Sequence, residues 1–279
     1  MRTTPRGVRS MLAALVVVAA LNCLLPPLVP PSVPALRLPL WVAIAVLSVA
    51  LVWPRATRVV RLSVGWLLVL ATVGQAFVVG DLIAMFATLL AVPVLALLAG
   101  PLRPRPRKAL VAAHAVAAAC WVGIAATFVA MAVLAMSTND IHRSATVYEL
   151  MALFDITLLP WANFATILTG VGLSLTTKWG LLRYRWVVAK IAIAAGILMM
   201  AFGFLHDSLE RVGAEATQLA ARGAATAHLS GTADVVLWSF GCALLGLIAA
   251  LLLSLYKPGG RTRRAAGDLH RGVRRHEHA

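Results

Sequence analysis

The sequence predicts an all-α, polytopic membrane protein with about eight transmembrane helices and both termini in the cytoplasm. Hydrophobic residues make up 61% of the 279 residues and charged residues only 13%, about half the charged share of soluble domains. Apolar runs close to the roughly twenty residues that cross a hydrocarbon core recur along the whole chain. Basic residues gather in every second connection between these runs. The pattern therefore predicts both the class and the orientation.

The first 100 residues are expected to form an N-terminal membrane region with four spans, at about 10–29, 38–54, 62–80 and 82–100. The run PPLVPPSVP ends the first span and stiffens the connection that follows toward polyproline II. Arginines before the first run and small residues after it are also typical of a signal peptide, whose removal would leave seven spans. Apart from Gln75, these spans contain almost no internal polar residue.

The stretch PLRPRPRK, residues 101–108, is a basic, proline-rich linker in which a helix is disfavoured. A second four-span domain is expected at 109–256, with spans at about 109–136, 147–174, 186–206 and 233–256. Residues 257–279 form a strongly basic tail with few apolar residues. We expect this tail to be disordered and to rest on anionic lipid headgroups.

The basic residues determine the predicted orientation. Of the 25 Lys and Arg residues, 20 fall on one side of the predicted membrane. The positive-inside rule places that side, with both termini, in the cytoplasm, and we expect the protein in the cytoplasmic (inner) membrane. Arg183 and Arg185 then lie in a short cytoplasmic turn, with Trp179, Tyr184 and Trp186 anchored at the interface. The net charge of +15 is explained by these clusters, so we expect no nucleic-acid partner.

Near the cytoplasmic ends of the second four spans, His114, Lys190 and Thr169 form a predicted inner polar layer. One interpretation is a buried hydrogen-bonding pair in which Lys190 reaches the interface. The other is a cofactor site in which His114 binds the iron of haem b and Lys190, with Arg183 or Arg185, holds the propionates. No second histidine stands at this depth in another span, so two histidine ligands are not predicted.

A second group of side chains lies toward the outer side, where the seventh span is expected to end at His206. Imidazole and thioether ligands suit copper, especially Cu(I), whereas methionine is also an ordinary packing residue in membranes. The predicted metal ligands are His206, Met199, Met200, Met131 and His142. A polar stripe on the sixth span is expected to face other helices, and it contains Asp155, Asn163 and Thr166.

No catalytic residue is predicted. The sequence contains no nucleotide-binding loop, nucleophile elbow, HExxH zinc motif or paired catalytic carboxylates. Cys23, Cys120 and Cys242 lie inside apolar runs without CxxC spacing, which is typical of small buried hydrophobic residues and not of a disulfide or zinc site. These observations argue against a hydrolase or kinase.

The segments RKALVAAHAVAAACWVG and LLPWANFATILTGVGLSLTTKWGLLRYRWVVAKIAIAAGILMMAFGFLH resemble a family of uncharacterised bacterial integral membrane proteins with a four-span domain. The resemblance covers about residues 107–210 and implies no established activity. More distantly, the segments are similar to the copper resistance protein D family and to a haem-binding membrane protoporphyrinogen oxidase family. The positions that carry the resemblance are His114, Trp121, Gly123, Thr169, Gly170, Trp179, Gly180, Leu181, Trp186, Lys190 and His206.

Three functional hypotheses follow. The leading one is a non-enzymatic membrane protein whose second four-helix domain binds or transports a small cargo such as copper. The second is a haem-binding redox protein that uses His114. The third is a structural or assembly subunit with a membrane-protein partner or a second copy of itself, indicated by small residues on the helix faces.

Overall fold

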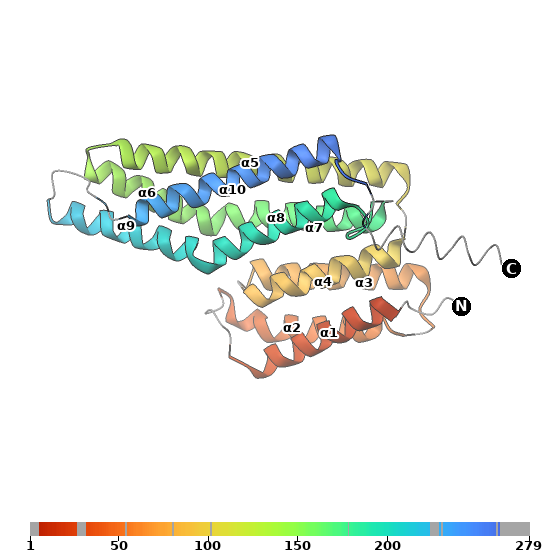
Figure 1. The fold of residues 1–279 in the computed structure, drawn as a ribbon. Helices are drawn as coiled ribbons and strands as arrows, with labels where there is room; N and C mark the ends of the chain where they lie inside the picture. The colour runs from red at the N-terminus through yellow and green to blue at the C-terminus, as the bar shows by residue number, and fades with distance from the viewer. Residues whose placement is uncertain are drawn as a thin grey trace. The chain divides into compact units, whose positions relative to one another are not determined.

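The computed structural model describes residues 6–26, 32–53, 55–79, 81–100, 102–177, 179–223, 229, 231–260 and 262. Within these ranges all regular structure is helical and no strand occurs, so the all-α class is confirmed (Figure 1). The chain forms two compact units, one of Met1–Leu110 with Leu168–Lys178 and one of Val111–Ile167 with Trp179–Ala279. Each unit is described by itself.

The first unit contains α1 (Arg6–Leu24), α2 (Pro34–Ala50), α3 (Arg58–Phe77) and α4 (Leu82–Ala99). The sequence explains where these helices begin. Pro34 occupies the first turn of α2, where its missing N–H costs nothing. The Thr57 side chain caps α3 by accepting a hydrogen bond from Val60 N, and the Asp81 carboxylate caps α4 by accepting one from Ile83 N.

The core of the first unit is apolar but also holds polar side chains. Helices α3 and α4 approach closely at Gly65, where an added Cβ would lie 3.0 Å from Leu95 Cδ1. Ser48, Thr72 and Thr88 are fully buried, in contrast to the expectation of almost no polar residue besides Gln75. Each hydroxyl donates to a carbonyl of its own helix, at 2.7–2.9 Å, so these residues are hydrogen-bonded without a partner helix.

The rest of the chain forms α5 (Pro104–Ser137), α6 (Ile141–Thr157), α7 (Leu159–Thr176), α8 (Arg185–Met200), a π-helical turn η1 (Ala201–Leu205), α9 (His206–Ala221) and α10 (Thr232–Tyr256). Helix α5 begins inside the proline-rich stretch that was predicted to disfavour a helix. Proline is tolerated in the first turn, where its N–H would lack a partner in any case. The segments Ile141–Thr176 and Arg185–Ala221 each continue as one long helical rod.

Among the described residues, six helical segments are long and apolar enough to cross a membrane, and the helices Pro34–Ala50 and Ile83–Ala99 are shorter apolar helices. This composition fits a multi-pass membrane protein. The six segments are Gly7–Leu24, Arg58–Ala76, Pro104–Ser137, Ile141–Thr176, Arg185–Ala221 and Thr232–Tyr256. The total of eight spans and the location of the termini stay predictions.

Three of these segments are longer than a bilayer needs. At 1.5 Å per residue, a rod of 36 or 37 residues measures about 55 Å, against about 30 Å of hydrocarbon. The seventh predicted span was expected to end at His206, but the helix continues to Ala221. The reason is a change of pattern, because α9 is amphipathic and buries only one face, which includes Leu209, Val212 and Ala216. A search for uninterrupted apolar residues misses such a helix.

We call the end of the second unit that contains α9 the acidic end. Residues 138–157 and 206–234 hold seven of the ten acidic residues of the chain and only three basic ones. Helices α6 and α9 pack closely there, since an added Cβ at Gly213 would lie 3.7 Å from Tyr148 Cβ. Phe128 of α5 and Phe240 of α10 place their ring centroids 4.5 Å apart. The acidic end is therefore a packed four-helix bundle (Figure 1).

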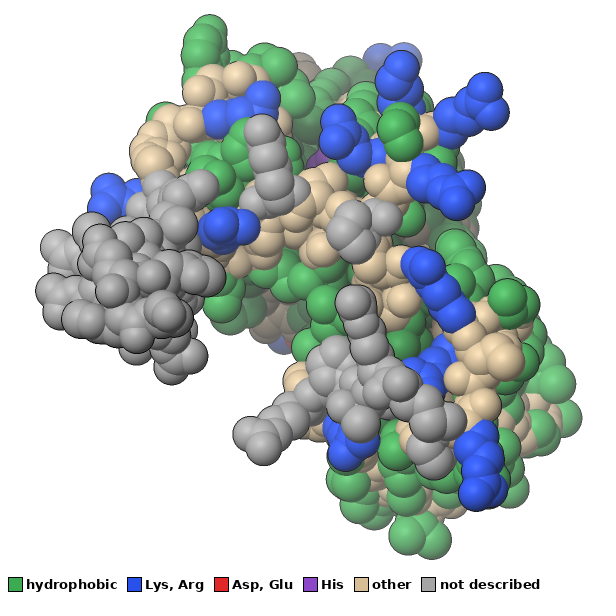
Figure 2. Space-filling view, turned by 90° about the vertical axis from the view of Figure 1, so that its right-hand side faces the viewer, with side chains coloured by type: hydrophobic (Ala, Val, Ile, Leu, Met, Phe, Trp, Pro, Cys, Tyr) green, Lys and Arg blue, Asp and Glu red, His purple; other side chains and the backbone are tan. Residues whose placement is uncertain are grey.

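The opposite end, where α8 begins and α10 ends, is called the basic end. Lys and Arg side chains gather on the face that Figure 2 shows. The Trp179 ring lies 5.1 Å from that of Tyr184 and 5.3 Å from that of Trp186, both edge to face. Lys257 Nζ lies 5.8 Å from the Trp179 ring centroid. The start of the basic tail is held as well, because Thr262 N donates to Arg183 O at 2.9 Å.

Candidate functional site

At the acidic end, His206 Nδ1 and Asp155 Oδ2 lie 2.7 Å apart, although the two residues are 51 positions apart in the chain. The Asp155 side chain is 12% exposed and that of His206 is 43% exposed. The sequence placed Asp155 in the polar stripe and His206 in the outer layer, and did not pair them. Each lies 21 residues from the basic end of its own rod, which ends at Thr176 or begins at Arg185. Counting residues from the basic end of each rod would therefore have predicted that Asp155 and His206 lie at the same depth.

Both rods are irregular beside this pair. The π turn η1 precedes His206 directly, and such turns alter the direction of the side chains that follow. In the other rod, α6 ends at Thr157 and α7 begins at Leu159, and Pro160 cannot donate a backbone hydrogen bond. Irregular turns in long helices are frequent at functional sites. Both irregular turns lie next to the His206–Asp155 pair, which makes this pair a candidate functional site.

Glu210 extends the pair to a centre of three side chains. Its Oε1 lies 3.5 Å from His206 Nε2, one helical turn away. That separation is too long for a good hydrogen bond. With the Nδ1 proton directed at Asp155, a neutral His206 imidazole carries its lone pair on Nε2. We call Asp155, His206 and Glu210 the His206 centre.

The other predicted metal ligands are not brought to the His206 centre by any contact described. The Met199 side chain is 70% exposed, whereas Met200 and Met131 are partly buried against the core of the acidic end. His142 is exposed in the first turn of α6. In the described part of the chain, no group of three or more His, Cys, Asp or Glu residues is suited to hold a metal ion. The thioether site stays a prediction.

The remaining residues of the polar stripe have different environments. The Thr166 hydroxyl donates to Ala162 O of its own helix at 2.7 Å. Asn163 is buried, with 7% exposed, and its Oδ1 has no hydrogen-bond partner among the described residues. Of the three predicted residues, Asp155 alone belongs to the His206 centre.

Near the basic end, Lys190 Nζ donates to Ser254 Oγ at 2.6 Å and lies 6.0 Å from the Trp186 ring centroid. His114 lies within electrostatic range of Lys190 and hydrogen-bonds the backbone of Thr166. The structure gives no direct contact between His114 and Lys190 among the described residues, and it adds Ser254 as a partner of Lys190, which the sequence did not indicate. Thr169 belongs to the first unit, so it is not placed relative to them. A haem at His114 stays a prediction.

The first unit contains a polar cluster that the sequence did not predict, which we call the Asp81 junction. Asp81 Oδ2 accepts hydrogen bonds from Trp41 Nε1 at 2.9 Å and from Gln75 Nε2 at 3.2 Å. Arg37 Nε lies 3.9 Å from the same oxygen, and the Arg37 guanidinium also donates to two carbonyls at the end of α1. Trp41 and Gln75 are fully buried. The junction therefore ties all four helices of the first unit together.

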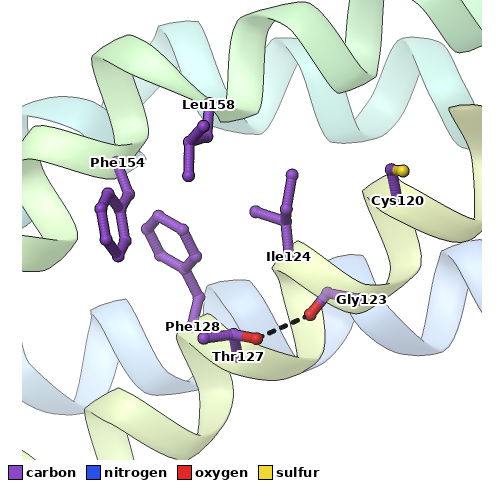
Figure 3. A pocket seen from close by; sticks show the side chains of 7 residues that line it. All are labelled: Cys120, Gly123, Ile124, Thr127, Phe128, Phe154 and Leu158. Carbon is purple, nitrogen blue, oxygen red and sulfur yellow. Dashed lines mark hydrogen bonds between the residues drawn. The ribbon is translucent and has the colours of Figure 1, made fainter.

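A cavity of about 400 Å³ lies in the second unit between α5 and the break that separates α6 from α7 (Figure 3). We call it the α5 groove. Cys120, Gly123, Ile124, Thr127 and Phe128 line it from α5. Phe154 and Leu158 line it from the opposite side, and their side chains point toward those of Ile124 and Phe128.

No family model, curated protein or solved structure matches the chain. The resemblance that the sequence analysis draws therefore stays a prediction, and the function is argued from the geometry alone.

Proposed function

We propose that this is a non-enzymatic protein of the bacterial cytoplasmic membrane that crosses it eight times, with both termini in the cytoplasm. We propose further that its acidic end faces outward and binds a divalent metal cation at the His206 centre, with Cu²⁺ as the best-fitting cargo. The single observation that carries the cargo proposal is the position of Asp155 Oδ2, 2.7 Å from His206 Nδ1.

A histidine that binds a metal usually donates its other ring N–H to a carboxylate, which fixes the tautomer and the ring orientation. Asp155 is placed to do this for His206, so Nε2 is left with its lone pair as a ligand. Glu210 Oε1 stands 3.5 Å from Nε2. Two ligands at neighbouring corners of a square-planar Cu²⁺ ion, each about 2.0–2.1 Å from it, are about 2.9 Å apart. A small rotation of the exposed Glu210 side chain would bring Oε1 to that separation from Nε2.

The donor atoms favour a different oxidation state from the one expected from the sequence. An imidazole nitrogen and a carboxylate oxygen suit divalent ions, and among these copper binds most tightly to a given nitrogen and oxygen site. Met199 is exposed while Met200 and Met131 pack against the core, so no thioether pair supports Cu(I). Two protein ligands leave the other coordination positions to water. This is typical of exchangeable binding and not of a structural metal.

The surrounding charge supports capture of cations. The excess of acidic over basic residues in 138–157 and 206–234 gives the acidic end a negative potential, which raises the local concentration of cations. At the other end, the gathered Lys and Arg side chains are placed to contact anionic lipid headgroups (Figure 2). One end thus attracts metal ions and the other anionic lipid.

The test is a copper titration of the detergent-purified chain against a competing chelator, with elemental analysis of the bound metal. We expect one equivalent of Cu²⁺, lost in His206→Ala and weakened in Glu210→Gln. His142→Ala, which removes another exposed histidine of the acidic end, is the matched control and should bind normally. Equal binding by all variants would refute the proposal.

Further measurements test the other expectations. An absorption spectrum of the same preparation without a Soret band removes the haem b hypothesis for His114. Purification in mild detergent tests for a membrane-protein partner or a homo-oligomer. A reporter active only outside the cytoplasm should stay silent when fused after Ala279 and be active when inserted between residues 222 and 231. Activity of the Ala279 fusion would contradict the proposed orientation.

A further inference from the structure

The α5 groove lies at a depth where a membrane contains only hydrocarbon. Cys120 and Phe128 lie 12 and 20 residues beyond Lys108, the last basic residue before the long apolar part of α5. At the helical rise these positions are about 18 and 30 Å from the basic side, within the half of the core nearer the acidic end. This placement rests on the proposal that α5 crosses the bilayer.

The lining of the groove excludes a polar occupant. Ile124, Phe128, Phe154 and Leu158 present only hydrocarbon. The one hydroxyl in the lining, on Thr127, already donates to Gly123 O at 2.9 Å (Figure 3). A cavity holds water stably only where several polar groups can bond it, and here only the Cys120 thiol and the Thr127 oxygen are available. The lining therefore fits an apolar occupant.

The surroundings identify that occupant. The groove is open to the side, and both helices carry further exposed apolar side chains, at Val116 and Val133 of α5 and at Leu153 and Ile156 of α6. Within a bilayer, surfaces of this kind face lipid chains. A volume of about 400 Å³ lies within the range of small-molecule sites, about 300–1,000 Å³. An alkyl chain from the neighbouring leaflet enters without desolvating any polar group.

We propose that the α5 groove is a lipid-binding site, which holds one acyl chain of a phospholipid in the leaflet nearer the acidic end. The chain lies between α5 and the break after α6, against Gly123, where the missing side chain leaves the room. Because the groove is concave, it holds a chain for longer than the flat lipid-facing surface of α10 does. The occupant is a membrane lipid and not a second copy of the protein, since only seven residues line the groove, whereas a stable protein interface uses about 20–30 residues a side.

The test is photolabelling of the full-length chain in vesicles of phosphatidylethanolamine and phosphatidylglycerol. The probe is a phosphatidylethanolamine with a diazirine in the middle of one acyl chain, and adducts are mapped by mass spectrometry. We expect the yield at Cys120, Ile124 and Leu158 to exceed several-fold the yield at Leu245 and Leu251. Those two leucines are exposed on α10 and report ordinary lipid contact.

A pair of glycine variants makes the test specific. An added Cβ meets no heavy atom within 4 Å at Gly123 or at Gly241, so both positions accept a larger side chain. Gly123→Leu fills the groove and should reduce its labelling to the level of Leu245. Gly241→Leu makes the same change on α10 and should leave the groove labelled.

Each outcome decides the inference. Groove labelling equal to that of α10, or unchanged in Gly123→Leu, would overturn the lipid site while leaving the membrane helices in place. Absence of labelling at Leu245 and Leu251 as well would instead overturn the proposed membrane crossing on which the site rests. Groove labelling that is enhanced and lost only in Gly123→Leu supports the site.

Discussion

Replacement of Asp81 by alanine is expected to lower the stability of the first unit strongly. The change removes the acceptor of the Trp41 and Gln75 hydrogen bonds, the partner of Arg37 and the cap of α4. The Asp81 side chain is only 9% exposed, so water does not replace these interactions freely. Removal of one partner from a buried ion pair costs about 3–5 kcal/mol. Loss of the helix cap adds about 1 kcal/mol to this cost.

Hydrogen–deuterium exchange of the purified chain measures this effect locally. Since about 1.4 kcal/mol corresponds to a factor of ten, peptides from α2 and α4 should exchange about 100-fold faster or more in Asp81→Ala. Peptides from α10, in the other unit, should not change. Asp207→Ala removes an exposed carboxylate from the first turn of α9 and is the matched control. Exchange rates in α2 and α4 within about twofold of those in the parent chain would refute the reasoning. Such a rate change corresponds to far less free energy than the loss of one partner from a buried ion pair.

Four further outcomes are expected. Asp155→Asn should weaken Cu²⁺ binding about 10–100-fold in the chelator titration, because the carboxylate that orients the His206 imidazole is lost. Unchanged affinity would show that Asp155 does not orient His206. Lowering the pH from about 7.5 to about 5.5 should release the metal, because protons compete for His206, whose imidazole must be neutral to bind. Gly246→Leu should destabilise the α8–α10 contact by about 1–3 kcal/mol in exchange measurements, because a Cβ added at Gly246 would lie 3.2 Å from Ile193 Cγ2 of α8. Gly241→Leu, in open space on the same helix, should not. Phe128→Ala should lower the free energy of unfolding by about 3–5 kcal/mol, because the side chain is 1% exposed and packs on a ring of α10. A decrease below about 1 kcal/mol would mean that the acidic end is loosely packed.

The helical class could be predicted from the sequence because a bilayer leaves the backbone no partner but itself. An apolar run of sufficient length is therefore a helix whatever its neighbours do. The end of the seventh helix could not be predicted in the same way. Beyond His206 the helix is held by one buried face, and its polar residues resemble those of a connection.

The candidate sites depended on contacts that no spacing encodes. His206 and Asp155 were each recognised as polar residues in apolar surroundings, but their pairing requires the π turn and the break at Leu158 to bring two rods into register. Arg37, Gln75 and Asp81 sit near helix ends. At such positions polar and charged residues are also expected at the membrane interface. Such residues become a cluster only when four helices are packed together. The predicted Met199 and Met200 are adjacent in sequence and therefore point to different sides of their helix.

The rod from Arg185 to Ala221 passes the His206 centre and begins beside the turn where Thr262 pairs with Arg183. It runs for about 55 Å without a flexible joint, apart from the single π turn. The two ends of a continuous helix of this kind rotate or tilt together. In the orientation that we propose, this rod connects the His206 centre to the turn that holds Thr262.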